Sequence, residues 1–209
     1  MPIFLLVICV SVLVVPVGAS AARDERQGQA ESYVQQGIER YEQGDISGAL
    51  AAFTRALESD ETNADAYSYR GLAHHHQGRI PEALRDYARA LSLRPEDSLA
   101  FTGRGIVLYQ QGELSAALRD FQNALRVDPL NGDASIGLGL VYEGKGDYKK
   151  AIAAYNRALK IDADNATAYT GRGIVFYLMG ERAQAKRDLE RARELGDSKA
   201  ADFLQRFDF

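Results

Sequence analysis

The sequence predicts an all-α protein, built as a solenoid of five helix-turn-helix units with a capping helix at the C-terminal end. Two observations predict this fold. Small residues recur at a constant spacing of 34 residues, and apolar residues fall at helical spacing on both sides of a glycine in the middle of each unit. One unit of this length has too little core to fold alone, so neighbouring units must bury each other's apolar faces. The chain is therefore expected to form one continuous array.

Four columns of small residues keep the period in all five units. Two columns are glycine and two are alanine: Gly37, Gly71, Gly105, Gly139 and Gly173; Gly44, Gly78, Gly112, Gly146 and Gly180; Ala49, Ala83, Ala117, Ala151 and Ala185; Ala56, Ala90, Ala124, Ala158 and Ala192. Gly78 and its equivalents are expected to adopt the left-handed conformation that ends the first helix of a unit. The other small residues let the helix backbones approach one another.

The period also sets the expected domain organisation. Residues 30–199 divide into the units 30–63, 64–97, 98–131, 132–165 and 166–199, and residues 22–29 form a polar linker before them. Pro81 suits the first turn of a second helix, where a missing N–H does no harm. Pro95 and Pro129 follow the second helices of their units and end them.

The end of the chain predicts one more amphipathic helix, over residues 200–209. Its apolar residues share one helical face at i, i+3, i+4, i+7 spacing, and they are Ala200, Phe203, Leu204 and Phe207. A solenoid needs such a cap because its last unit otherwise exposes the face that a following unit would cover.

Large residues are expected to fill the space beside the small ones. One aromatic column lies near the start of the first helices and another lies in the second helices: Tyr33, Tyr67, Phe101 and Tyr169; Phe53, Tyr87, Phe121 and Tyr155. Three further glycines, Gly103, Gly137 and Gly171, lie inside first helices, where glycine costs about 0.5 to 1 kcal/mol relative to alanine. Two explanations stay open for them, close packing of helices and room for a ligand segment.

This order of aromatic, Gly, aromatic, Ala, aromatic, Ala and Pro on a 34-residue period resembles the tetratricopeptide repeat, from Ala30 to Lys199. The resemblance implies a right-handed solenoid, here similar to extracytoplasmic bacterial members of the family. The family's large-aromatic column departs from type at Ser135. Its proline column is empty at Glu61, Ala163 and Asp197, so the first, fourth and fifth units are the less typical ones.

Arginine and aspartate covary between the units. Three units place Arg before the first-column glycine and Asp sixteen residues later, and the pairs are Arg70 with Asp86, Arg104 with Asp120, and Arg172 with Asp188. The two units that lack this arginine carry Gln36 and Leu138 instead, and they have Ala52 and Ala154 in place of the acid. We expect each arginine to pair with the acid of its own unit, with two parallel hydrogen bonds. An anionic ligand for the arginines is the weaker alternative, because each already has a partner.

The family resemblance also implies a concave groove that is lined by the first helices. The three implied columns are Val34, Ser68, Thr102, Ile136 and Thr170; Ile38, Leu72, Ile106, Leu140 and Ile174; Tyr41, His75, Tyr109, Glu143 and Tyr177. Such a groove would be apolar with a ladder of tyrosines, and it would bind a protein or peptide partner. The Lys and Asn set with which chaperone-binding members clamp a terminal carboxylate is absent at these positions.

The N-terminal segment predicts export from the cytoplasm. Residues 1–21 contain no Lys, Arg, Asp, Glu or His, and the apolar stretch from Ile3 to Val17 has the length of a signal-peptide core. We expect cleavage after Ala21 and a periplasmic or secreted mature chain. The alternative is an uncleaved anchor in the inner membrane with the array facing the periplasm. Cys9, the only cysteine, lies in this segment, so a cleaved chain would form no disulfide.

Composition and the remaining polar residues disfavour several classes of function. A net charge of −4 lacks the basic footprint that nucleic-acid binding needs. His74, His75 and His76 cannot face one metal, because successive side chains on a helix point about 100° apart. No carboxylate pair recurs with a nucleophile, so we expect no cofactor and no enzyme.

Two functions remain as hypotheses. The first is a noncatalytic scaffold or adaptor in the bacterial cell envelope, which binds a partner segment in the groove through Tyr41, Tyr109, Tyr177 and the aliphatic column. The second is a self-associating structural or assembly protein, with the membrane-anchored form as a variant of it.

Overall fold

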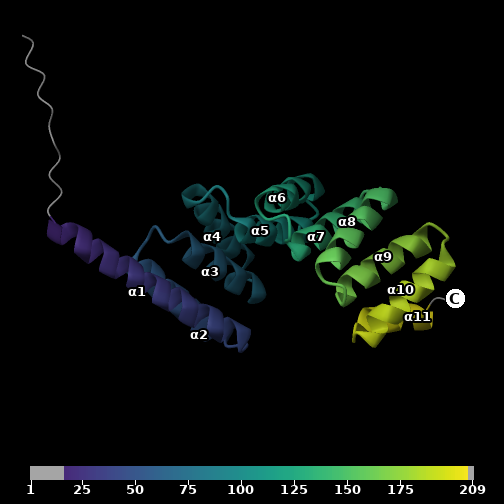
Figure 1. Cartoon of the computed structure of the whole chain (residues 1–209), viewed down its shortest axis with the longest axis horizontal. Helices are drawn as coiled ribbons and strands as arrows, with labels where there is room; N and C mark the ends of the chain where they lie inside the picture. Colours follow the sequence, from purple (N-terminus) through teal and green to yellow (C-terminus); the bar gives the residue numbers. More distant parts are fainter. Residues whose placement is uncertain (1–16, 207–209) are drawn as a thin grey trace, which may run out of the picture.

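Residues 17–206, which the computed structural model describes, form eleven helices and no strand. The helices are α1 (Val17–Glu42), α2 (Ile46–Ser59), α3 (Ala64–His76), α4 (Ile80–Leu93), α5 (Ser98–Gln110), α6 (Leu114–Val127), α7 (Gly132–Gly144), α8 (Tyr148–Ile161), α9 (Ala166–Leu178), α10 (Arg182–Glu194) and α11 (Ser198–Arg206). Consecutive helices pack as hairpins, and the hairpins follow one another along the long axis from α1 to α11 (Figure 1). The predicted all-α solenoid is confirmed.

The helix ends follow from short-range signals in the sequence. The side chains of Asn63, Asp97, Asn131 and Asn165 each accept a hydrogen bond from a backbone N–H in the first turn of the helix that follows. The turn inside each hairpin contains a glycine of the second glycine column, with φ between +72° at Gly78 and +81° at Gly180. This is the left-handed conformation that was expected. Pro81 lies in the first turn of α4, as predicted.

The first helices of the units line the inner side of the stack. Neighbouring first helices contact each other, from α1 and α3 through to α7 and α9. No two successive second helices of the described chain make a comparable contact, although each contacts the first helix that follows it. The stack therefore curves toward the first helices, which puts the expected groove columns on the concave side.

The start of the chain differs from the expected polar linker. Residues 22–29 belong to α1, where Arg26 Nε donates to the carbonyl oxygen of Ala22 at 3.1 Å. This segment contains no proline, and Ala, Arg, Glu and Gln all favour a helix, so nothing in it stops α1 from extending toward the N-terminus. Most of the expected signal segment, with Cys9, lies outside the described residues. The expected cleavage point after Ala21 falls within α1. Among the helices of residues 17–206, none has the length and apolar character of a membrane span.

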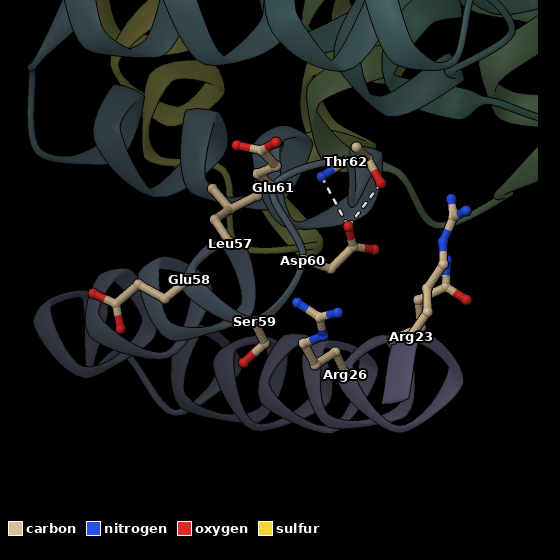
Figure 2. A pocket seen from close by; sticks show the side chains of 9 residues that line it. Arg23, Arg26, Leu57, Glu58, Ser59, Asp60, Glu61 and Thr62 are labelled. Atoms are coloured by element: carbon tan, nitrogen blue, oxygen red, sulfur yellow. Dashed lines mark hydrogen bonds between the residues drawn. The ribbon is translucent and has the colours of Figure 1, made fainter. Parts of the chain in front are cut away.

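The extension of α1 borders a polar cavity of about 390 Å³ at the end of the solenoid. Figure 2 shows Arg23 and Arg26 of α1 on one side and the α2–α3 turn on the other. In this turn Asp60 accepts hydrogen bonds from the backbone N–H and the hydroxyl of Thr62, at 2.9 and 2.7 Å. Both arginines are exposed, so this cavity is a solvated surface feature rather than an enclosed site.

Each second-helix aromatic of the middle units is held between two glycines of different units. Phe121 of α6 lies against Gly105 of α5 and Gly137 of α7, and a Cβ placed on Gly137 would lie 2.4 Å from Phe121 Cζ. Tyr87 and Tyr155 have equivalent places between Gly71 and Gly103 and between Gly139 and Gly171. Close packing, and not room for a ligand, therefore explains Gly103, Gly137 and Gly171. The second unit has Tyr69 at the position that is Gly103 in the third unit. The Tyr69 ring stacks on that of Phe53, with ring centroids 5.8 Å apart.

Gly137→Ala is expected to lower the free energy of unfolding by about 1 to 3 kcal/mol, because the new methyl group overlaps the buried ring of Phe121. Gly28→Ala in α1 is the matched control, since a Cβ there meets nothing within 4 Å. That substitution should raise helix stability by about 0.5 to 1 kcal/mol. Urea unfolding of both variants tests the difference, and equal effects of the two substitutions would contradict the packing explanation.

The capping helix α11 covers the apolar end of the fifth unit. Ala200 is fully buried against Leu189 and Ala192 of α10, and Phe203 and Leu204 pack on the same cluster. Phe207 lies outside the described residues. The helix begins at Ser198 rather than at residue 200, because the turn before it is closed by Gly196 with φ of +94°, as in the turns inside the hairpins.

Candidate binding groove

The three predicted arginine–aspartate pairs form as expected. Nε and Nη2 of Arg70, Arg104 and Arg172 donate to the two carboxylate oxygens of Asp86, Asp120 and Asp188, at 2.7 to 2.9 Å. Each guanidinium also lies over an aromatic ring one turn earlier, namely Tyr67, Phe101 or Tyr169. The hydrogen bonds to the aspartates raise the pKa of the three arginines. Each arginine is engaged by the aspartate of its own unit, and Arg172 also donates to Asn156 Oδ1 of the preceding unit, so we assign these residues to structure and not to ligand binding.

The aliphatic groove column lies on the concave side and is half-buried throughout. It consists of Ile38, Leu72, Ile106, Leu140 and Ile174, one from each of α1, α3, α5, α7 and α9. Each residue keeps part of its side chain exposed while packing on its own unit, which is the condition under which a partner can bury the remainder. The structure thus places the column where the family resemblance implied it.

The hydroxyl column differs from the expectation of free groove residues. Thr102 of α5 and Thr170 of α9 are buried, and their hydroxyls bond the residues that precede α7 and α11. Asn131 Nδ2 donates to Thr102 Oγ1 at 3.0 Å, and Thr170 Oγ1 donates to Asp197 Oδ2 at 2.6 Å. Their polar atoms hold one unit to the next, because a buried hydroxyl without a partner would be costly.

Ser68 makes the same kind of bond, with its hydroxyl donating to Asp97 Oδ2 at 2.7 Å. At the two remaining junctions the column carries Val34 and Ile136, which have no hydroxyl to donate. The side-chain bond between first helix and capping residue is therefore present at three junctions and missing at two.

The ladder of aromatic residues is only partly open to a partner. Tyr41 and Tyr109 are half-buried, and burial raises the pKa of both phenols. His75 Nε2 is hydrogen-bonded to Gln110 Oε1 at 2.9 Å. Tyr177, expected as a groove residue, is contacted edge-on by Phe203 of the capping helix, with ring centroids 5.2 Å apart. The cap therefore covers the last position of the ladder.

The histidine run separates as its helical spacing requires. His74 packs inward with its side chain 14% exposed, and its Nε2 lies 3.8 Å from Asp86 Oδ2. Burial lowers the pKa of His74. The ring of His76 meets that of Tyr41 at 5.7 Å. Residues 17–206 contain no cluster of His, Cys, Asp or Glu side chains that could hold a metal ion.

Two cavities open along the groove columns. One, of about 230 Å³, lies between α1 and α3 and is lined in part by Val34, Ile38 and Tyr69. The other, of about 410 Å³, lies between α7, α9 and the start of α11, where Leu140 and Ile174 contribute to its walls. The smaller cavity occurs at a junction where the hydroxyl bond is missing, whereas Thr170 and Asp197, which form such a bond, both line the larger one.

Sequence reasoning did not find the part of the larger cavity that the cap contributes. Leu195, Gly196 and Asp197 line it from the α10–α11 turn, and Lys199 lines it from the first turn of α11. The spacing carries a signal for this turn. A 34-residue step from Asn165 reaches position 199, but the capping residue Asp197 lies two residues before it. Asp197 accepts hydrogen bonds from Thr170 and from the backbone N–H of Lys199.

Glu143 takes the ladder position that is tyrosine in three of the other units, and it lines the larger cavity. The hydroxyl of the fully buried Tyr155 donates to Glu143 Oε2 at 3.0 Å. Burial raises the pKa of Glu143, although the hydrogen bond from Tyr155 acts in the opposite direction. Burial and the nearby carboxylate also raise the pKa of Tyr155.

Glu143→Gln is expected to reduce the pH dependence of stability. Because the folded-state pKa of Glu143 is raised above its ordinary value of 4.5, stability from this group is complete below that value and is lost as the pH rises through the folded pKa. The variant should therefore gain stability relative to the parent at neutral pH, and the gain should shrink as the pH falls toward 4.5. Urea unfolding of both proteins over this range measures the gain. A gain that does not change with pH would contradict the assignment.

Comparison with known proteins gives the same picture of the fold. The tetratricopeptide repeat family model matches residues 34–98 and 102–166. No protein among those with curated descriptions matches this sequence.

Solved structures show the same architecture. A crystal structure of MamA is 27% identical, covers 79% of this chain and 96% of its own, and superposes with a TM-score of 0.63. YrrB, described as a tetratricopeptide repeat protein with an unusual peptide-binding site, is 22% identical, with coverage of 90% and 97% and a TM-score of 0.64. Pseudomonas aeruginosa pilF is 20% identical, with coverage of 84% and 79% and a TM-score of 0.74.

Proposed function

Because this chain belongs to the tetratricopeptide repeat family, we propose that it is a noncatalytic scaffold that binds a segment of a partner protein in its concave groove. Members of the family typically act as interaction scaffolds rather than as enzymes. The similar protein YrrB is described as having a peptide-binding site. In this chain the half-buried aliphatic column offers apolar surface of the kind that a peptide segment buries.

The observation that carries the proposal is the coincidence of the cavities with the aliphatic column. Ile38 lines one cavity, and Leu140 and Ile174 line the other. Both cavities therefore open onto residues of the aliphatic column. Binding sites typically combine an apolar lining with a few placed polar groups. Glu143 and Asp197 are such groups in the larger cavity.

Capture of partners from envelope extract tests the proposal. The bait is the purified chain, compared with a Tyr41→Ala/Tyr109→Ala variant, which changes the two ladder tyrosines that α11 does not cover. Leu130→Ser is the matched control, because Leu130 is 72% exposed in the α6–α7 turn and belongs to no groove column. A partner that the parent and the control capture, and that the double variant loses with its helicity unchanged, supports groove binding. Equal capture by all three baits would place binding on another face.

We also propose that the protein works outside the cytoplasm of a bacterial cell, as a periplasmic or secreted protein. The support is the uncharged, apolar segment at the start of the sequence with Ala19-Ser20-Ala21 at its end. N-terminal sequencing of the protein from fractionated cells provides the test. A mature chain that begins at Ala22 supports export with cleavage. An intact N-terminus in the membrane fraction supports the anchored form, and an intact chain in the cytosol contradicts both.

A specific observation favours self-association as the second candidate function. Leu178 and Met179, at the end of α9, are 50% and 37% exposed. The equivalent residues of the other units are Glu42 and Gln43, His76 and Gln77, Gln110 and Gln111, and Gly144 and Lys145. Exposed apolar residues at one end of a solenoid can pair two copies. The molar mass of the parent should then increase with concentration, whereas a Leu178→Gln/Met179→Gln variant should stay monomeric. A parent mass that stays constant would remove this candidate.

A further inference from the structure

Glu143 is a carboxylate held partly out of water without a cation to balance it. The other acids that are withdrawn from solvent inside the hairpins are Asp86, Asp120 and Asp188, and each has an arginine bonded to both of its oxygens. Among residues 17–206, Glu143 forms no ion pair, and its one hydrogen-bond donor is the uncharged phenol of Tyr155. The ionised form of such a partly buried, unpaired acid is stabilised when a positive charge approaches it.

The surroundings of Glu143 leave room for that charge. Its side chain lines the cavity of about 410 Å³ together with residues of α9 and of the α10–α11 turn. Leu140 and Ile174 form an apolar wall of the same cavity. An arriving side chain would thus meet a carboxylate and an aliphatic surface close together.

The remaining charged groups of the cavity do not neutralise Glu143. Asp197 adds a second negative charge, and its oxygens are already engaged by the Thr170 hydroxyl and by the backbone N–H of Lys199. Lys199 is exposed at the edge of the cavity and pairs with no acid in the described part of the chain. The cavity therefore carries two acids and one lysine, which complements a positive ligand.

We propose that this cavity recognises a partner segment that presents a lysine or arginine side chain to Glu143, with a neighbouring Leu, Ile, Val or Met side chain against Leu140 and Ile174. This proposal rests on the proposed function, since it names the chemistry of the segment that the groove binds. Glu143 Oε2 keeps its hydrogen bond from Tyr155, which orients the carboxylate, and the arriving cation supplies the missing positive charge. The ionised form of Glu143 is the one that binds.

Selection from a random peptide library tests the proposal directly, because it measures which residue types the cavity prefers. A display library of random nonapeptides is panned against the purified full chain, and against the Glu143→Gln, Glu143→Lys and Glu113→Gln variants. Glu113→Gln is the matched control for Glu143→Gln, because Glu113 is exposed in the α5–α6 turn, lies outside the cavity and carries the same charge. The frequency of each residue type in the selected pools is the readout, and circular dichroism verifies that each variant is folded.

The expected result is enrichment of Lys or Arg beside an aliphatic residue in the pools from the parent and from Glu113→Gln. Glu143→Gln should lose the basic preference but keep the aliphatic one, and Glu143→Lys should select acidic residues instead. Parent pools without Lys or Arg enrichment, or a Glu143→Gln pool that matches the parent, would overturn this inference and leave groove binding intact. If the parent recovers no more peptide from the library than an unrelated protein does, the proposed function is overturned as well.

A synthetic peptide of the selected consensus then gives the size of the effect. Its dissociation constant, measured by fluorescence polarisation, should rise about tenfold to a hundredfold in Glu143→Gln, as for loss of a charge-assisted hydrogen bond. Added salt should weaken binding to the parent more than binding to Glu143→Gln, because screening acts on the charge pair. Equal affinities for the parent and the variant would contradict the proposal.

Discussion

Replacement of Phe121 by alanine is expected to lower the free energy of unfolding by about 3 to 5 kcal/mol. The ring is 1% exposed and lies between Gly105 of one unit and Gly137 of the next. Neither glycine has a side chain that could move into the vacated space, so the cavity should remain open. Because the ring joins two units, the loss should affect the whole array rather than one hairpin.

Urea unfolding followed by circular dichroism measures this loss. Leu130→Ala is the control, since Leu130 is 72% exposed and its truncation should change the stability by less than about 0.5 kcal/mol. Phe121→Leu should cost less than Phe121→Ala, because the fifth unit already holds Leu189 in this column. A loss for Phe121→Ala no larger than that of the control would contradict the role of the ring between units.

The second large effect is expected at the arginine–aspartate pairs. Asp120→Ala should lower the free energy of unfolding by about 3 kcal/mol, because it leaves Arg104 partly buried without its acid. This is the lower end of the range for a fully buried pair, since 29% of the Arg104 side chain remains exposed while Asp120 is 6% exposed. The protein itself supplies the compensating change, because the fourth unit has Leu138 and Ala154 at the equivalent positions.

The double variant Arg104→Leu/Asp120→Ala copies that natural combination into the third unit. It should be more stable than Asp120→Ala alone, since no unpaired charge remains. A double-mutant cycle, completed with Arg104→Leu, isolates the coupling between the two side chains. Losses that simply add would show that the pair contributes no coupling energy, despite the two hydrogen bonds of 2.7 and 2.9 Å.

Features that depend on local spacing could be predicted from the sequence. Residues that form the solenoid, the left-handed turns and the arginine–aspartate pairs recur at the 34-residue period. Comparison of the five units therefore shows which residue types each position requires. Gly78 and Gly112 could be placed in turns, and Arg70 could be paired with Asp86, without any coordinates.

Features that depend on contacts between units could not be predicted in the same way. The sequence left two explanations open for Gly137, because only the packed structure shows the Phe121 ring beside it. Thr102 and Tyr177 were expected in the open groove, but Asn131 and Phe203 from later helices engage them. The linker expectation was wrong because polar composition alone does not stop a helix. The residues of the α10–α11 turn escaped notice because they break the period.

The missing hydroxyl bonds at Val34 and Ile136 bear on the mechanics of the molecule. Directional hydrogen bonds resist sliding and twisting, whereas aliphatic contacts are non-directional and tolerate both. The superhelix is therefore expected to be most compliant at the junction of the first and second units, where one cavity opens. At the junction of the fourth and fifth units, Arg172 and Arg191 bond Asn156 and Asp164 of the preceding unit and restrict such motion. A ligand bound at the first junction would change the pitch of the superhelix there, so its binding is expected to change the distance between the two ends of the molecule.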